Sequence, residues 1–258
     1  MKKLSTLNIV NTLTTILVIT VNVLANALPL NGLNTGEISD RFDIYFVPAG
    51  YVFSIWGLIY IGLIAFTLYQ LLPQGRENSK VRNIGYLYAL SGIANIVWIF
   101  FWHYEVFLLT PVAMLILLTS LVALYLRLGI GRATFSTAER WTLQVPFSIY
   151  LGWISVATVA NVTQWLYYID WGGWGLSPEV WALVMLIVAA AIAGTVIWTR
   201  RDAAYGLVFV WAYAGIAVKH AATPIVSVPA GILAGIIALV ILVRFLRRSG
   251  EPAAVPAG

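Results

Sequence analysis

Three apolar stretches of the chain carry tryptophan, tyrosine and asparagine side chains at helical spacing. In residues 140–168, a rotation of about 100° per residue places one such stripe on a single helix face. Its members are Tyr150, Trp153, Ala157, Asn161, Gln164 and Trp165. Flat aromatic walls with a few hydrogen-bonding groups are typical of small-molecule sites. Because amides are costly in hydrocarbon without a partner or water, this stripe should face the interior of a helix bundle.

The same pattern occurs on neighbouring stretches. Residues 84–103 present a stripe within an arc of about 80°, formed by Tyr88, Ser91, Asn95, Trp98 and Trp102. Residues 47–72 present a stripe within about 60°, formed by Phe53, Trp56 and Tyr60. Residues 8–29 hold four asparagines within about 60°, namely Asn8, Asn11, Asn22 and Asn26. If these faces meet, they enclose an aromatic cavity with amide groups in its wall.

The composition places these stripes in a membrane protein. Of 258 residues, 61% are hydrophobic and 10% are charged, and the mean hydropathy is +0.89. No soluble domain of this length tolerates such values on its surface. The chain has no cysteine and only two histidines, His103 and His220, which excludes disulfides and cysteine-based sites and argues against a multi-histidine metal site. The predicted fold is an all-α polytopic membrane helix bundle.

We predict about eight transmembrane helices, each near or above the roughly 20 residues that a bilayer requires. They are residues 8–29, 47–72, 84–103, 105–127, 140–168, 178–199, 203–220 and 225–247. The connections alternate in charge, since only Arg41 and Lys219 of the 15 basic residues fall on the side that holds most of the acidic ones. The excess of basic residues predicts that both termini are cytoplasmic. The expected location is a bacterial inner (cytoplasmic) membrane.

Two features allow other interpretations. Lys2, Lys3 and an apolar stretch ending at Ala25-Asn26-Ala27 resemble a secretory signal, but the stretch is long, and we treat it as a retained first helix. Aromatic residues cluster at the predicted outer boundary, and a belt at the membrane interface explains Tyr167, Tyr168, Trp171 and Trp174. For the deeper Trp98, Trp153 and Asn95, plain helix packing is the alternative to a cavity.

Motifs within the first five predicted helices resemble those of the TspO/MBR family, the tryptophan-rich sensory proteins related to the translocator protein (peripheral benzodiazepine receptor). The family element W-x-P-P…W-x-x-L-Y is similar to Pro48…Trp56-Gly57-Leu58-Ile59-Tyr60. The element L-N-x-x-W-x-x-x-F-F is similar to Asn95-x-x-Trp98 with Phe100, Phe101 and Trp102. The element P-Y-L-A-W-x-x-x-A-x-x-L-N-x-x-x-W is similar to Tyr150-Leu151-Gly152-Trp153…Ala157…Asn161…Trp165. The resemblance covers about residues 8–168, and the chain looks like a longer, eight-helix relative.

This resemblance implies a five-helix ligand-binding bundle over residues 1–168, closed by the loop between its first two helices. The implied ligand is flat and hydrophobic, a tetrapyrrole such as protoporphyrin or heme, or a similar pigment. The implied pocket residues are Tyr45, Pro48, Trp56, Tyr60, Asn95, Trp98, Trp153, Ala157 and Asn161. Some positions depart from the family pattern, because Tyr45 replaces its loop tryptophan, Val47 its first proline and Ser91 its glutamine. These departures leave the ligand's identity open.

Residues 169–248 have no counterpart in the five-helix pattern and are predicted to form three additional transmembrane helices. Residues 249–258 are rich in proline and alanine and are predicted to be a disordered tail. In the last helix, Gly231 and Gly235 form a G-x-x-x-G motif beside Ala230 and Ala234, which lets backbones approach closely. We favour packing within this chain for that surface, with a homodimer or a larger membrane complex as the alternative.

The sequence therefore predicts a membrane receptor or carrier for a hydrophobic small molecule, in contact with the lipid bilayer and not with nucleic acid. The alternative is a structural or assembly subunit of a larger membrane complex. No catalytic constellation is visible, so nothing supports an enzyme that degrades porphyrin in light. Lys219 lacks the mid-span counter-ion that a retinal Schiff base requires and should extend outward. His103 beside Glu105 stays a minor alternative as a ligand to a tetrapyrrole metal.

Overall fold

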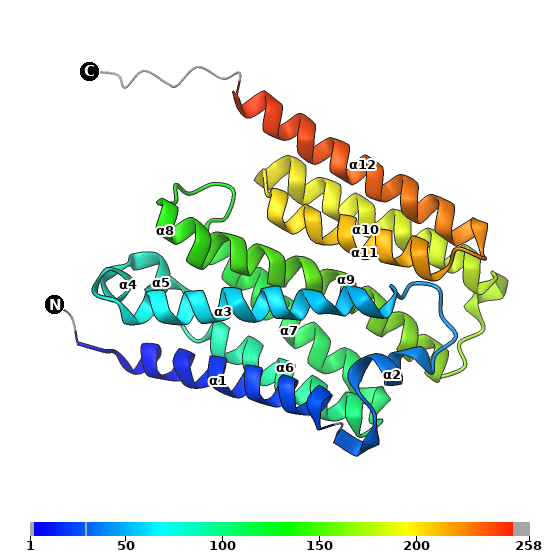
Figure 1. Ribbon diagram of the computed structural model, residues 1–258, viewed down its shortest axis with the longest axis horizontal. Helices are drawn as coiled ribbons and strands as arrows, with labels where there is room; N and C mark the ends of the chain where they lie inside the picture. The colour runs from blue at the N-terminus through cyan, green and yellow to red at the C-terminus, as the bar shows by residue number, and fades with distance from the viewer. Residues whose placement is uncertain (1–2, 29, 250–258) are drawn as a thin grey trace.

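Eight long helices dominate the computed structural model, which describes residues 3–28 and 30–249 and has no strand among them (Figure 1). They are α1 (Thr6–Ala27), α3 (Ile55–Leu71), α6 (Leu87–His103), α7 (Thr110–Leu128), α9 (Val145–Tyr168), α10 (Pro178–Arg200), α11 (Ala203–Lys219) and α12 (Pro224–Ser249). Six stretches of the described chain are long and apolar enough to cross a membrane, and α6 and α11 are apolar helices of 17 residues. Each predicted span contains one long helix, so the all-α polytopic bundle is confirmed.

Short helical elements fill the connections. They are η1 (Leu30–Gly32), α2 (Thr35–Asp40), η2 (Gly50–Ser54), α4 (Pro73–Glu77), α5 (Ser79–Ile84), η3 (Phe107–Leu109), α8 (Thr137–Glu139), the π-helical η4 (Arg140–Gln144) and η5 (Gly173–Gly175). The predicted tail begins where α12 ends, and its residues 250–258 lie outside the described residues.

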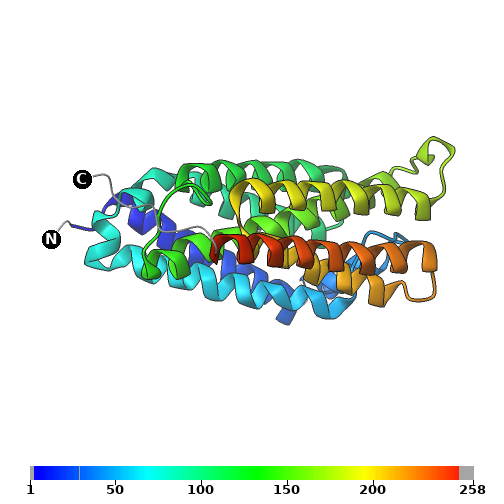
Figure 2. The same ribbon diagram turned by 90° about the horizontal axis from the view of Figure 1, so that it is seen from above.

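Successive long helices run in opposite directions, so the connections gather at two ends of the molecule (Figure 2). One end holds α4, α5 and the segment between α7 and α8, with the α10–α11 junction, and we name it the basic end for its arginines and lysines. The other end holds residues 28, 30–54, 104–109, 169–177 and 220–223, and we name it the acidic end. The alternation of charge along the sequence thus corresponds to opposite ends of the bundle.

Local sequence signals set several helix ends. Ser5 caps α1, and Asn34 caps α2 by accepting hydrogen bonds from the backbone N–H groups of Gly36 and Glu37. Gly129 ends α7 in the left-handed conformation, which glycine adopts without steric cost. Such caps satisfy backbone groups that a helix end leaves without partners.

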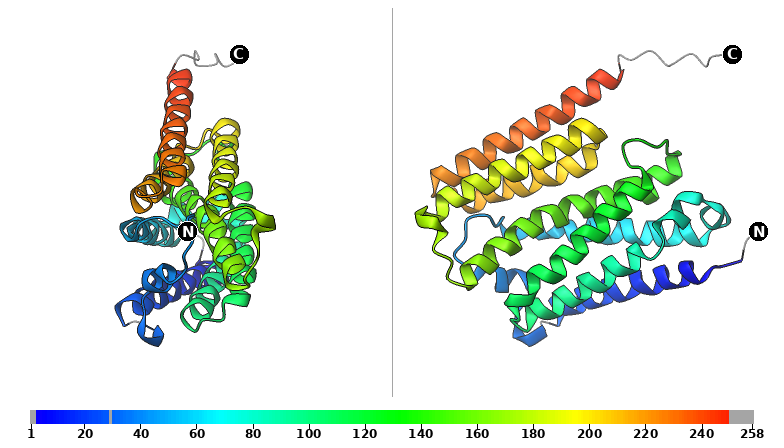
Figure 3. Two further views of the ribbon diagram at one scale, coloured as in Figure 1. Left: turned by 90° about the vertical axis from the view of Figure 1, so that its right-hand side faces the viewer. Right: turned by 180° about the vertical axis from the view of Figure 1, so that it is seen from behind.

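The helices form two groups that meet along α9. The five-helix bundle consists of α1, α3, α6, α7 and α9, and the second group consists of α10, α11 and α12. In the second group α11 packs on α9, and α12 packs on α10 and α11, farther from the bundle (Figure 3). Gly152 on α9 makes this junction close, because a Cβ there would lie 3.0 Å from the carbonyl oxygen of Tyr205 on α11. The additional helices are therefore packed directly against the bundle, through α11.

The G-x-x-x-G surface of α12 differs from our expectation. A Cβ added at Gly231 or Gly235 would meet nothing within 4 Å, whereas Ala230 and Ala234 are buried. The alanines therefore face the other helices and the glycines face outward. The prediction that the two glycines pack within the chain is wrong. The face of α12 that packs within the chain is the adjacent one, which carries Ala230 and Ala234.

Candidate functional site

The stripes of α3 and α9 meet in one aromatic group inside the bundle. Trp153, which is 3% exposed, has its ring centroid 5.7 Å from Phe53 and 6.4 Å from Trp56, both at edge-to-face angles. Trp56 also stacks on Tyr60 at 5.7 Å and contacts Tyr150 at 6.0 Å. Edge-to-face and offset-stacked pairs are the favoured arrangements of aromatic rings. The predicted convergence of these two helices is therefore present.

The stripe of α6 forms a second aromatic group with the loop after α1. Trp98 stacks on Trp102 at 5.3 Å, and Trp102 contacts Phe107 at 5.4 Å and Phe42 at 5.9 Å. The indole N–H of Trp102 donates to the backbone oxygen of Thr35, 3.2 Å away. This group joins α6 to the segment of residues 30–54, which we name the lid.

A small cavity of about 50 Å³ lies between the two aromatic groups. Five of the nine predicted pocket residues line it, namely Pro48, Trp98, Trp153, Ala157 and Asn161. Its wall also contains Phe53, Trp102 and Gln164 from the predicted stripes. A water molecule occupies about 30 Å³ in the liquid, so this closed conformation leaves no room for a tetrapyrrole.

The other four predicted residues do not line the cavity. Trp56 and Tyr60 lie in the aromatic group that contacts Trp153. The side-chain oxygen of Asn95 accepts a hydrogen bond from Asn22 of α1 at 2.7 Å. Tyr45 is turned toward the second helix group.

Tyr45 connects the lid to α10 and α11. Its hydroxyl donates to Glu179 at 3.0 Å, and its ring lies 5.3 Å from that of His220. Sequence reasoning placed Tyr45 over the pocket because the resemblance ended before residue 169, and it could not include partners from later helices.

Unpaired polar atoms gather on the predicted stripes of α6 and α9. Eight buried side-chain nitrogen or oxygen atoms of the described residues have no hydrogen-bond partner within the protein. Six belong to these stripes, on Asn95, Trp98, Tyr150, Trp153, Asn161 and Trp165. A buried polar group without a partner costs about 1–3 kcal/mol, and native interiors contain few. Three of these six residues, Trp98, Trp153 and Asn161, line the cavity.

Asn161 on the cavity wall and Asn95 on α6 each have one end of the amide paired and one end unpaired. Asn161 donates to the hydroxyl of Thr110 at 3.1 Å, while its Oδ1 has no partner. Asn95 accepts from Asn22, while its Nδ2 has no partner. The paired end fixes each side chain, so the unpaired end is held in place. The indole N–H groups of Trp98 and Trp153 make this wall richer in donors than in acceptors.

The lid is tied down at the acidic end by two ion pairs. Arg41 pairs with Glu105 at 2.5 Å, and Lys219 pairs with Asp40 at 2.6 Å. The hydrogen bond from Arg41 lowers the pKa of Glu105 below its usual value. Lys219 does extend outward as expected, and its partner is the carboxylate of the lid. The only two basic residues that the sequence places at this end thus both hold the lid.

Neutral contacts close the lid further. Gln164 of α9 donates to Ser39 at 3.0 Å, and the backbone N–H of Ala49 donates to the carbonyl oxygen of Gly215 on α11 at 3.1 Å. A Cβ at Gly215 would lie 2.2 Å from the side chain of Val52, so only glycine permits this approach. The lid therefore contacts both helix groups.

His103 is fully buried, and both of its ring nitrogens are engaged. Its Nδ1 lies 3.2 Å from the carbonyl oxygen of Leu30, and its Nε2 lies 3.1 Å from the hydroxyl of Thr35. Because a carbonyl only accepts, Nδ1 donates and Nε2 accepts. This histidine ties the lid to α6 and has no free nitrogen for a metal. No group of three or more acidic or histidine side chains among the described residues could hold a metal ion.

Fold and site together define an α-helical polytopic membrane protein with a small aromatic cavity between α6, α9 and the lid. The chain belongs to the TSPO-like protein family, whose family model matches residues 8–243. The match continues past residue 168 and through α10, α11 and most of α12, so the additional helices fall within it. Comparison with curated proteins gave no match, and comparison with solved structures gave none.

Proposed function

We propose that this protein is a membrane receptor or carrier for a flat hydrophobic ligand with hydrogen-bond acceptors at its edge, a tetrapyrrole such as protoporphyrin or a similar pigment. The observation that carries the proposal is the set of unpaired polar atoms beside the aromatic cavity. Aromatic faces stack on a planar ligand, and the unpaired N–H groups of Trp98 and Trp153 on the cavity wall suit carbonyl or carboxylate oxygens.

The chemistry of the wall favours the organic ring over a metal at its centre. The residues that line the cavity include no histidine, methionine or cysteine, which are the usual protein ligands of heme iron. His103 has both nitrogens occupied. The proposal is therefore for a metal-free tetrapyrrole or pigment, bound by stacking and by hydrogen bonds at its edge.

Binding requires the lid to move, because the closed cavity has about 50 Å³. The lid is held by ion pairs whose side chains are between 27% and 63% exposed, and exposed pairs contribute only about 0–1 kcal/mol each. Such contacts hold a closed state that a ligand can displace. The acidic end lies opposite both termini. With both termini in the cytoplasm, a ligand that enters there comes from the outer side of the membrane.

Quenching of tryptophan fluorescence by protoporphyrin tests the site in purified protein. We expect Trp153→Phe, which keeps an aromatic ring but removes the N–H, and Asn161→Leu, which removes an unpaired acceptor from the cavity wall, to weaken binding at least several-fold. Trp174→Phe is the matched control, because Trp174 is 81% exposed and remote from the cavity wall. Unchanged affinity in both cavity variants would refute the site.

The outward glycines of α12 favour a second candidate, a structural or assembly subunit. Gly231 and Gly235 leave an exposed surface on which another transmembrane helix can pack closely. Native-size analysis in mild detergent distinguishes the two functions. A lone monomer or a homodimer counts against the assembly role, and a larger complex that Gly235→Leu disperses supports it.

A further inference from the structure

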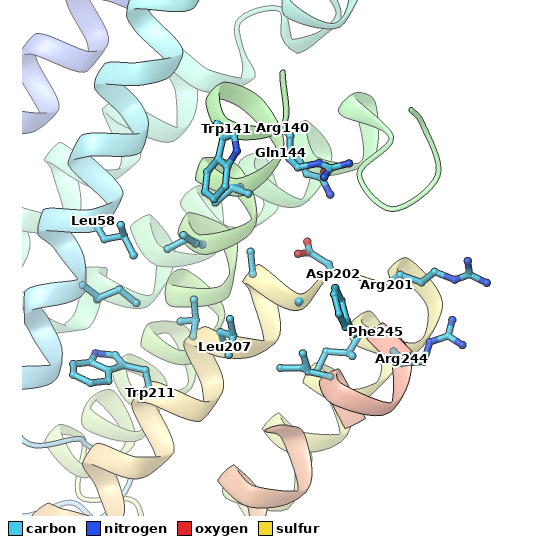
Figure 4. A pocket seen from close by; sticks show the side chains of 18 of the residues that line it. Leu58, Arg140, Trp141, Gln144, Arg201, Asp202, Leu207, Trp211, Arg244 and Phe245 are labelled. Atoms are coloured by element: carbon cyan, nitrogen blue, oxygen red, sulfur yellow. The ribbon is translucent and has the colours of Figure 1, made fainter. Parts of the chain in front are cut away.

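A second hollow, distinct from the cavity, lies where the two helix groups meet near the basic end (Figure 4). It is an open groove of about 750 Å³, within the roughly 300–1,000 Å³ of small-molecule sites. Its walls are mostly apolar and include Leu58 of α3, Ile149 of α9, Leu207 and Trp211 of α11, and Phe245 of α12. Together with Ile197 of α10, five long helices therefore contribute to one mostly apolar groove.

Three arginines from three different elements line the same groove. They are Arg140 of η4, Arg201 at the end of α10 and Arg244 of α12. Figure 4 shows them on one side of the groove, with Leu58 and Trp211 on the opposite side. The groove is therefore amphipathic, with a cationic rim at the basic end and an apolar interior.

Arg244 is held in place and still has a donor to spare. Its guanidinium donates to the backbone oxygen of Trp198 at 2.9 Å and lies 4.6 Å from the centroid of that indole. Its Nε is buried and has no partner within the protein. A guanidinium that is already positioned loses little freedom when it binds an anion, so this arginine is prepared for an acceptor at the rim.

Among the described residues, one carboxylate lines the groove, and it does not cancel this charge at the rim. Asp202 is 2% exposed and accepts from Tyr125 at 2.9 Å, from Ser148 at 2.6 Å and from the backbone N–H of Tyr205 at 3.1 Å. Burial raises its pKa above the usual value for aspartate. Its oxygens are therefore committed to α7, α9 and α11, and they leave the arginines to set the electrostatics of the opening.

We propose that this groove binds one anionic phospholipid, with its phosphate at the three arginines and an acyl chain along Leu207 and Trp211. Charge complementarity decides for this occupant, because guanidinium groups pair with phosphate by strong, often bidentate hydrogen bonds. Basic pockets between transmembrane helices are typical sites for anionic head groups. A zwitterionic lipid should bind less tightly, because the positive charge of its head group is repelled by the arginines at the same rim.

Native mass spectrometry of the full chain after delipidation tests the proposal, with phosphatidylglycerol and phosphatidylcholine of identical acyl chains supplied in equal amounts. We expect the protein to retain phosphatidylglycerol in preference. The double variant Arg140→Gln/Arg244→Gln should lower the bound phosphatidylglycerol at least five-fold. Arg127→Gln/Arg132→Gln is the matched control, because it removes two exposed charges from the basic end outside the groove and should retain the lipid.

A second variant separates shape from charge. Leu207 lines the groove and is 54% exposed, so Leu207→Trp adds volume inside the groove without overpacking the buried core. This variant should also lower lipid retention. Equal retention of both lipids, or retention unchanged in both groove variants, overturns the proposal. Displacement of the lipid by millimolar inorganic phosphate would mean a free-anion site, and a lipid-free species of two copies would mean that a second chain covers the groove. Either result overturns it.

Discussion

The cavity inside the five-helix bundle and the groove at the junction of the two helix groups differ in almost every physical respect. The cavity is small, aromatic and uncharged, with neutral donors such as the N–H of Trp153 left unpaired. The groove is much larger and mostly apolar, with charged donors such as Arg244 at its rim. On the functions proposed above, the cavity must enlarge before a ligand can enter, whereas the groove already has the volume of a small-molecule site.

We expect the largest loss of stability from a substitution at the junction between α9 and α11. Gly152→Leu forces a side chain into the backbone of α11, because even a Cβ lies 3.0 Å from the carbonyl oxygen of Tyr205. Overpacking costs typically about 1–3 kcal/mol, and we expect the upper end of that range here. Thermal unfolding in detergent measures it, and Gly194→Leu, with nothing within 4 Å of its Cβ, is the control. Equal loss of stability in both variants would contradict this account of the junction.

The unpaired amide in the cavity predicts opposite effects on stability and binding. Asn161→Leu removes an acceptor without a partner, and Thr110 still donates to the backbone oxygen of Phe107. Replacing a half-paired polar group by an apolar one of similar shape is nearly neutral or stabilising. We expect unchanged or slightly higher stability, by up to about 1 kcal/mol, with several-fold weaker quenching by protoporphyrin. A large loss of stability would show that this amide serves the fold.

We expect the smallest effect from variants of the lid, which should change the rate of ligand association and leave lipid binding unchanged. Arg41→Gln combined with Lys219→Gln removes two partly exposed ion pairs, worth about 0–1 kcal/mol each. Ligand association in stopped-flow quenching should become up to about ten-fold faster, while phosphatidylglycerol retention stays the same. If association does not change, the lid is not the entrance.

Acid should have the same effect through Glu105. Its folded-state pKa is lowered by Arg41, so the stabilisation of the closed lid is present above the usual glutamate pKa and is lost as pH falls through the lowered one. Association in the unchanged protein should therefore accelerate in acid. Arg41→Gln should flatten this dependence, and an equally steep profile in that variant would assign it to another group.

The sequence predicted the cavity better than the groove for a physical reason. Helical periodicity identifies residues on one face, so spacing placed Trp153 and Asn161 on one stripe and Trp98 on another, and the family resemblance brought the two stripes together. It could not predict that Tyr45 bonds to Glu179, 134 positions away, or that the lid closes the cavity to a small volume. These depend on how elements dock, which periodicity does not encode.

The groove gave no signal in the sequence because its parts come from separate elements. Arg140, Arg201 and Arg244 were visible only as members of a basic side, and nothing in their spacing shows that three helix ends meet. We expected Gly231 to pack against other helices of this chain, and instead it faces outward. The reason is similar: two faces of α12 carry small residues, and the sequence alone does not show which face docks.

The close approach of Gly215 to Val52 ties the entrance of the bundle to a helix that a five-helix chain would lack. A lid that swings open must slide along α11, and α11 also forms one wall of the groove. The same helix therefore contacts the lid near the acidic end and the groove toward the basic end.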